Sequence, residues 1–216
     1  MSAVFLRRYL DRLRSRSSDR RDRGAVMIEF LLAVPIVILF LFAVIEFSLL
    51  WRNSLTVSTA TQLGARAAAN AGPHRLADHN ALSSALAGLS ELPDDSTIER
   101  IVVFSPINDA GDIDPDCLTG PSKAGRCNVY EGALLNNPLP ADFTAAADPA
   151  TQTTCEPGSP DEAWCPGGRE NDFSNGFDQV GVYVQVRHRF VTGLVLPSRE
   201  QIIRDEAVMQ LEPEVN

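Results

Sequence analysis

The sequence has few of the features on which enzymes and nucleic-acid-binding domains depend. It holds three histidines in 216 residues and contains no G-x-S-x-G, H-E-x-x-H or glycine-rich phosphate-binding signature. Basic side chains are scarce beyond the N-terminus: the first 23 residues hold eight of the 19, which leaves 11 against 25 acidic side chains. Because phosphate binding requires a basic face, we expect no nucleic-acid partner. Because the catalytic and phosphate-binding signatures are missing, we expect neither enzymatic activity nor a cofactor.

Charge is absent from a long run near the N-terminus. Residues 30–45 carry no charged side chain, and with residues 47–51 the apolar tract reaches about 20 positions, enough to cross ~30 Å of hydrocarbon. Trp51 and Arg52 follow, where an interfacial anchor belongs. The eight arginines before the tract favour a cytoplasmic N-terminus, so we predict a single-pass membrane protein with an extracytoplasmic C-terminal part.

Cysteine is absent from the first 116 residues. The four cysteines form two C-x₉-C pairs and are Cys117, Cys127, Cys155 and Cys165. All four follow the apolar tract and are therefore predicted to face an oxidising space, where disulfides persist. Pairing of neighbours is the simplest of three possible connectivities, and the sequence leaves the other two open. A zinc site requires closer cysteine spacing, so no metal centre is expected from these residues.

One acidic loop has the beginning of a calcium-binding pattern. Its alternating carboxylates are Asp112, Asp114 and Asp116. The pattern then fails, because Cys117 replaces the required glycine and Lys123 occupies the place of the final glutamate. We therefore expect a solvated acidic loop. We also expect His188, which lies between two arginines on a predicted strand, at the surface.

The N-terminal segment admits several interpretations. A secretory signal has an apolar region of roughly 7–15 residues with a cleavage site close behind, whereas the nearest small-x-small site here, residues 69–71, lies far past the tract. A twin-arginine signal at residues 7–8 is separated from the tract by polar residues 11–23. A plain anchor explains the apolar run, but it leaves a border glycine, Gly24, and an acid near the helix start, Glu29, without a reason.

The order of residues at this border resembles a type IV prepilin of the Flp/Tad class. A basic leader ends at Gly24, and a carboxylate and an aromatic residue then open the apolar helix. Over residues 20–72 the chain is similar to TadE-like proteins, the minor pseudopilins of tight-adherence secretion systems, and its closing strands are similar too. The residues that carry the resemblance are Gly24, Ala25, Glu29, Phe30, Pro35 and Glu46, followed by the Ala- and Arg-containing stretch 55–72.

The resemblance implies processing and assembly. It implies that a prepilin peptidase cuts between Gly24 and Ala25 on the cytoplasmic side of the inner membrane. It also implies that Glu29 and Phe30 act in assembly, with Glu29 pairing with the new ammonium group of a neighbouring subunit. The implied partners are the membrane, the peptidase, other pilins and pseudopilins, and the pilus assembly platform, in a system for secretion and surface adherence. The alternative is an uncleaved single-pass accessory protein or adhesin with a pilin-like anchor.

The rest of the sequence predicts a small mixed domain. Leucines three or four positions apart predict a helix at 77–92, and alternating valines at 180–186 predict a half-buried strand. Pro35 is expected to kink the long helix, Gly72-Pro73 to end it, and small residues between 60 and 71 to allow close packing. The expected elements are helices at 25–70 and 77–92, strands at 97–107, 179–190 and 202–212, and loops at 108–178.

The predicted fold class is α+β and pilin-like. A long N-terminal transmembrane helix is expected to pack on a small antiparallel sheet with long disulfide-containing loops. Three domains are expected: a basic cytoplasmic leader at 1–24, a transmembrane and assembly helix at 25–72, and an extracytoplasmic α+β domain at 73–216.

Overall fold

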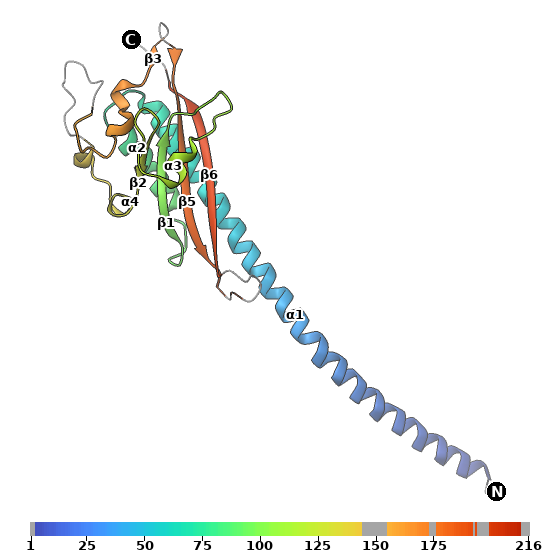
Figure 1. Ribbon diagram of the computed structural model, residues 1–216. Helices are drawn as coiled ribbons and strands as arrows, with labels where there is room; N and C mark the ends of the chain where they lie inside the picture. The colour runs from blue at the N-terminus through green and yellow to red at the C-terminus, as the bar shows by residue number, and fades with distance from the viewer. Residues whose placement is uncertain (1–2, 144–154, 173–175, 192, 194–198, 213–216) are drawn as a thin grey trace. The chain divides into compact units, whose positions relative to one another are not determined.

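A computed structural model of the 216-residue chain describes residues 3–143, 155–172, 176–191, 193 and 199–212. Its first element is the long helix α1, Ala3–Ala71 (Figure 1). The chain divides into two compact units. One unit comprises residues 1–48 and 192–197, and the other comprises residues 49–191 and 198–216.

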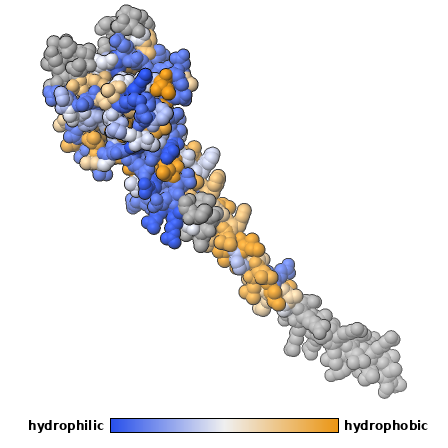
Figure 2. All heavy atoms as spheres, viewed as in Figure 1, coloured by the Kyte–Doolittle hydropathy of each residue, from blue (hydrophilic) through white to orange (hydrophobic). Residues whose placement is uncertain are grey.

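The first unit contains the apolar part of α1. The helix continues without interruption through Pro35. The kink that the sequence predicts at Pro35 stays a prediction. Large apolar side chains are exposed along this part, including Phe30, Leu32 and Phe40 at 66–69 % (Figure 2). Among the described residues one helical stretch, Gly24–Ala71, is long and apolar enough to cross a membrane, and its most apolar window has no buried residue. An exposed surface of this kind is stable in lipid and costly in water.

The second unit is built on a four-stranded antiparallel sheet. Its order is β2-β1-β5-β6, and β5 and β6 pair over eleven residues, from Gln179 opposite Gln210 to Arg189 opposite Glu200. The strands are β1 (Thr97–Phe104), β2 (Cys127–Tyr130), β5 (Gln179–Arg189) and β6 (Glu200–Gln210), with a separate pair of β3 (Asn171–Asp172) and β4 (Gly176–Phe177). Three of the four sheet strands were predicted, and β2 was not.

Two helices cover one face of this sheet. The part of α1 from residue 49 to residue 71 and the helix α2, Ala77–Leu89, bury small side chains against each other and against the sheet. A Cβ on Gly88 would lie 2.9 Å from the Cα of Ala60, and one on Gly64 would lie 3.2 Å from side chains of Ala85 and Val182. The predicted close packing by small residues is therefore present, and larger side chains would separate the helices.

A disulfide-containing loop covers part of the other face. Its helix α3, Pro115–Thr119, places Cys117 in a small core with Val102, Phe104 and Tyr183. The short elements that complete the loop-rich region are α4 (Ala133–Asn136) and the 3-10 turns η1 (Pro140–Asp142), η2 (Glu162–Trp164) and η3 (Pro166–Gly168). The predicted α+β class is confirmed: a long N-terminal apolar helix, a small antiparallel sheet and two disulfides.

The pairing of Phe104 with Gly181 generates a prediction. These two residues are opposite each other in β1 and β5, and a Cβ on Gly181 would overlap the buried Phe104 ring. Gly181→Ala should lower the free energy of unfolding by about 1–3 kcal/mol through overpacking. Urea unfolding of the full chain in detergent measures this change. The double variant Phe104→Leu/Gly181→Ala should lose less than the sum of the single variants, and strict additivity would contradict the proposed overlap.

Candidate functional site

The predicted processing site lies in a uniform helical segment. Gly24 and Ala25 are both exposed within α1, and no atom lies within 4 Å of the position that a Cβ on Gly24 would take. No other part of the described chain covers Gly24 or Ala25. Glycine in a helix interior is about 1 kcal/mol less favourable than alanine, so Gly24 is a place where α1 can unwind locally.

The predicted assembly residues are exposed one helical turn further along. Glu29 and Phe30 project from α1 with no covering element, and Phe30 is 66 % exposed. Glu29 makes no hydrogen bond or ion pair with any residue that the structure describes. A carboxylate beside a membrane span is costly unless it is paired.

A second acid in the apolar part of α1 is in a different environment. Glu46 is only 5 % exposed, and its Oε1 accepts a hydrogen bond of 3.3 Å from the backbone N–H of Gly193. Gly193 belongs to the same compact unit as Glu46, although it follows β5 in the sequence. The two acids of α1 thus differ: Glu46 is engaged within the chain, and Glu29 is presented outward.

The four cysteines form two disulfides between neighbours. Cys117 is bonded to Cys127, and Cys155 is bonded to Cys165, each with ten residues of sequence separation. The first connects α3 to β2, and the second closes the loop that leads into η3. Of the three connectivities that the sequence left open, the structure has the pairing of neighbours.

The lysine that interrupts the calcium pattern binds two carboxylates of the acidic loop. The Nζ of Lys123 donates to Asp114 Oδ2 at 2.8 Å and to Asp116 Oδ2 at 2.6 Å. These hydrogen bonds raise the pKa of Lys123, and the one to Asp114 lowers the pKa of that carboxyl. No group of three or more potential metal ligands occurs in the part of the chain that the structure describes.

A buried polar network fixes the second disulfide loop to the core. Asp78 at the start of α2 accepts from Arg169 Nη2 at 2.6 Å, and its other oxygen accepts from Asn128 Nδ2 and the Tyr130 hydroxyl, both at 2.7 Å. The side chains of Asp78 and Arg169 are fully buried. The Arg169 guanidinium also lies 3.9 Å from the ring centroid of Trp164. Burial, followed by the Asp78 charge, raises the pKa of Tyr130 well above its ordinary value, so the hydroxyl remains a donor.

The prediction for His188 was wrong. Its side chain is 1 % exposed, and its Nδ1 lies 2.9 Å from Nδ2 of Asn53 on α1. Its ring also makes an edge contact with Phe190. The side chain shares the helix-facing side of β5 with the buried valines, whereas its neighbouring arginines point to the opposite face.

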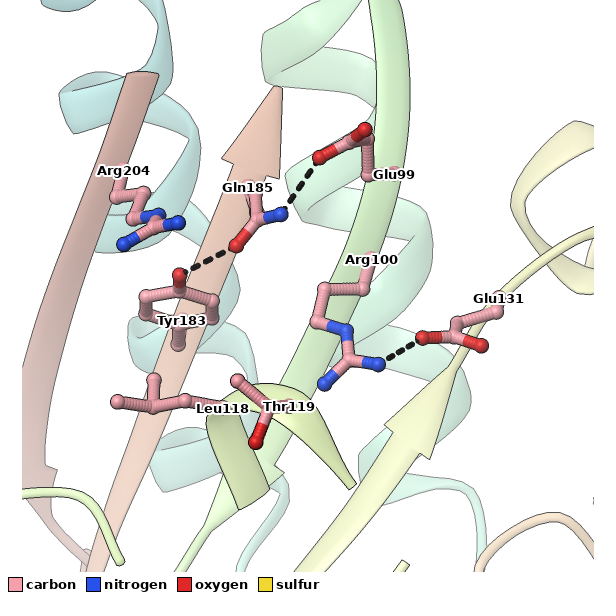
Figure 3. Close-up of a pocket in the computed structure, with 8 residues that line it drawn as sticks. All are labelled: Glu99, Arg100, Leu118, Thr119, Glu131, Tyr183, Gln185 and Arg204. Atoms are coloured by element: carbon pink, nitrogen blue, oxygen red, sulfur yellow. Dashed lines mark hydrogen bonds and ion pairs between the residues drawn. The ribbon is translucent and has the colours of Figure 1, made fainter. Parts of the chain in front are cut away.

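A pocket of about 580 Å³ lies on the sheet face that α3 only partly covers (Figure 3). Tyr183 donates to Gln185 at 2.8 Å, and Gln185 donates to Glu99 at 2.6 Å, which lowers the pKa of Glu99. Arg100 pairs with Glu131 across the pocket. The lining residues are Glu99, Arg100, Leu118, Thr119, Glu131, Tyr183, Gln185 and Arg204, and none of them is a predicted site residue.

The part of the chain that is similar to a known protein family lies within α1. Residues 24–66 match the model of a family described as TadE-like protein. The chain carries a TadE-like segment. The predicted resemblance is confirmed over these residues, and the match begins at the border glycine, Gly24. No curated protein and no solved structure matches the chain.

The TadE-like segment includes both the exposed apolar part of α1 and residues of α1 that pack in the domain core. It contains the exposed Gly24, Ala25, Glu29 and Phe30, and it extends to the small residues that pack against α2 and the sheet. A single N-terminal apolar helix of this kind fits a single-pass membrane protein.

The buried network was missed by sequence reasoning, although one signal was available. Asp78 precedes Leu82 by four positions and Ala85 by seven, so it lies on the apolar face of α2. A carboxylate on an apolar helix face requires a buried partner. Arg169 is 91 residues away in a loop, and no sequence pattern identifies it as that partner.

The network predicts a large loss of stability for Asp78→Ala. This change leaves the Arg169 guanidinium buried without its counter-ion and should lower the free energy of unfolding by about 3–5 kcal/mol. Glu91→Ala is the matched control, because the Glu91–Arg52 pair is exposed and 3.6 Å long, and it should cost less than about 1 kcal/mol. Tryptophan fluorescence during urea unfolding of the full chain reports both. Equal effects would show that the network does not hold the loop.

Proposed function

We propose that this chain is a minor pseudopilin of a Tad/Flp pilus that a prepilin peptidase cleaves after Gly24. In this proposal the protein is inserted in the inner membrane with its N-terminus in the cytoplasm and its disulfide-bonded domain outside. It acts in pilus assembly, and through it in secretion and surface adherence. Its partners are the peptidase, other pilins and pseudopilins, and the assembly platform; it acts neither as an enzyme nor as a nucleic-acid-binding protein.

The observation that carries the proposal is the TadE-like match together with the exposure of its first residues. The match begins at Gly24, and every side chain from Gly24 to Phe30 is exposed at the start of an apolar helix. A peptidase therefore has access to the bond, and a neighbouring subunit has access to the carboxylate of Glu29. The two disulfides support the extracytoplasmic position of the domain, because disulfides persist in oxidising compartments.

Cleavage after Gly24 would give Glu29 a partner. A new ammonium group at Ala25 is positively charged at neutral pH, since an α-amino group has a pKa of about 8. Glu29 lies four residues further on, so the new helix end presents one positive and one negative group on the same face. Pairing each with its counterpart on a neighbouring subunit would neutralise both in an apolar setting.

The second candidate is an uncleaved accessory protein or adhesin with a pilin-like anchor. The helix α1 runs from Ala3 through Gly24 without a break, and the uncleaved protein would keep this helix whole. The two candidates differ in one measurable property, which is the first residue of the protein in the envelope.

The proposed cleavage after Gly24 can be tested by finding the first residue of the mature protein. Mass spectrometry of protein extracted from membranes with an intact pilus system should find a chain that begins at Ala25. Gly24→Ile should block this cleavage, because a bulky side chain does not fit a subsite for glycine. Ala33→Ile, which places the same side chain at another exposed position of α1, should be cleaved normally. Unprocessed wild-type protein would favour the uncleaved candidate.

The proposed role of Glu29 in assembly can be tested by substitution of this residue. Glu29→Ala should be cleaved normally but should reduce pilus yield strongly, because the ammonium group of the neighbouring subunit then has no counter-charge. Glu29→Gln keeps the shape and removes the charge, and it should be nearly as defective. Counting pili by electron microscopy, with cleavage followed by mass spectrometry, separates the two steps. Pilus yield at the wild-type level in both variants would refute the charge-pairing role of Glu29.

A further inference from the structure

The pocket on the α3 side of the sheet is shaped by an extra residue in strand β1. Two consecutive residues of β5 lie opposite Ile98 and Arg100, so Glu99 between them has no residue opposite it in β5. Consecutive side chains of a regular strand point to opposite faces, and a bulge changes that alternation. Ile98 packs against the helix-side core, while Glu99 and Arg100 both line the pocket of about 580 Å³. The bulge thus places two charged side chains next to each other on one face.

A chain of hydrogen bonds fixes the floor of this pocket (Figure 3). The Tyr183 hydroxyl donates to Gln185 Oε1 at 2.8 Å, and Gln185 Nε2 donates to Glu99 Oε2 at 2.6 Å. The other oxygen of Glu99 accepts from Arg187 Nε at 2.8 Å. Because both of its oxygens have donors, the Glu99 carboxylate has a fixed position before a ligand arrives.

One wall of the pocket is held by Arg100. Its Nη1 donates to the carbonyl oxygens of Cys117 and Gly120 at 3.2 and 3.4 Å, and its Nη2 pairs with Glu131. The side chain of Arg100 is 12 % exposed, whereas that of Glu131 is 51 % exposed. Arg100 thus holds α3 and Glu131 in place, and the exposed part of the Glu131 carboxylate can accept further hydrogen bonds.

The other wall carries an arginine without a direct partner. Arg204 of β6 lies opposite Gln185 in the β5–β6 pairing and lines the pocket (Figure 3). It makes no hydrogen bond and no ion pair with any residue that the structure describes, including Glu206, which lies two residues along the same face of β6. Each acidic residue that lines the pocket is already paired with another arginine. The guanidinium of Arg204 is therefore left to bind an anion.

The free groups of the pocket define the ligand that it can bind. A planar guanidinium binds a carboxylate through two parallel hydrogen bonds. On the side of α3 and β2, Thr119 provides a hydroxyl and Glu131 an acceptor, which suits ligand hydroxyl groups because a hydroxyl both donates and accepts. Strands β6 and β2 are three strand spacings apart, roughly 14 Å. The ligand must therefore carry its carboxylate and its hydroxyl groups on different sides of a frame such as a sugar ring.

We propose that this pocket binds a uronic acid, a sugar whose carboxylate pairs with Arg204 and whose hydroxyl groups bond to Thr119 and Glu131. The free sugar acid and a uronic acid residue within an acidic polysaccharide share this chemistry. The volume of about 580 Å³ is in the range of small-molecule sites and exceeds that of one sugar ring. The inference goes beyond pilus assembly, and it depends neither on cleavage after Gly24 nor on the membrane anchor.

Saturation-transfer NMR with defined sugars tests the site. The full chain is embedded in phosphatidylcholine nanodiscs and titrated with D-galacturonate, and the neutral sugar D-galactose is the matched ligand control. A ligand of about 13 heavy atoms in a preformed pocket is expected to bind with a Kd of about 1 mM. Empty nanodiscs measure binding to the lipid, and circular dichroism verifies that each variant is folded.

We expect galacturonate to bind the wild-type protein about ten-fold more tightly than galactose does. Arg204→Gln should weaken galacturonate binding by about ten-fold, and Arg204→Lys, which keeps the charge but not the planar fork, should weaken it less. Arg75→Gln removes the same charge from another exposed position and should leave the Kd nearly unchanged. Absence of a galacturonate signal, equal binding of galactose, or an equal loss in Arg75→Gln would overturn the proposal.

Thr119→Val tests the binding of the sugar hydroxyl groups separately from the charge. It removes the Thr119 hydroxyl at nearly constant size, so galacturonate binding should weaken several-fold because a ligand hydroxyl loses its partner. An unchanged Kd would contradict the assignment of a sugar to this pocket.

Trigalacturonate distinguishes the two sources of the uronic acid. If it binds more tightly than the monomer by more than its three rings account for, the ligand is a residue of an acidic polysaccharide. If it binds more weakly than the monomer, the pocket excludes the chain and the ligand is the free sugar acid. Loss of both signals in Arg204→Gln supports the same site for either source.

Discussion

A carboxylate in an apolar environment must have a partner, and three acids of this chain meet that constraint in different ways. Asp78 finds its partners within the domain: an arginine, an asparagine and a tyrosine, all buried with it. Glu46 accepts from a backbone amide of the β5–β6 turn. Glu29 has no such partner among the described residues of the single chain. The first two acids are satisfied within one molecule, and for the third we propose a partner on another molecule.

The two parts of α1 have different surroundings, and their side chains differ in size and exposure. From residue 24 to residue 48, α1 presents large apolar side chains outward, as a lipid environment requires. Beyond that point its buried side is made of small residues such as Ala60 and Gly64, which allow α2 and the sheet to approach closely. The TadE-like match covers both parts. It ends before α2 begins, so the domain beyond it is argued from its own residues.

How much of this could be predicted from sequence depended on whether the signal was local. Alternating valines predicted β5, the apolar run predicted the anchor, and the spacing of the cysteines favoured the observed disulfides. Strand β2 was missed because its four residues, Cys127–Tyr130, are fixed by pairing with β1 and by a disulfide, not by their own pattern. The Asp78–Arg169 pair was missed for a similar reason, since its members are 91 residues apart. The error at His188 was avoidable, because its even-numbered position continues the buried series from Val180 to Val186.

We propose that Glu29 pairs with an ammonium group that cleavage after Gly24 creates. A zero-length carbodiimide cross-linker, applied to isolated pili or membranes, joins a carboxylate to an amine only where the two are already in contact. Mass spectrometry should then find the Glu29 carboxylate joined through an amide bond to the α-amine of a neighbouring pilin or pseudopilin. Recovery of an uncleaved peptide across Gly24–Ala25, with Glu29 unlinked, would contradict the account.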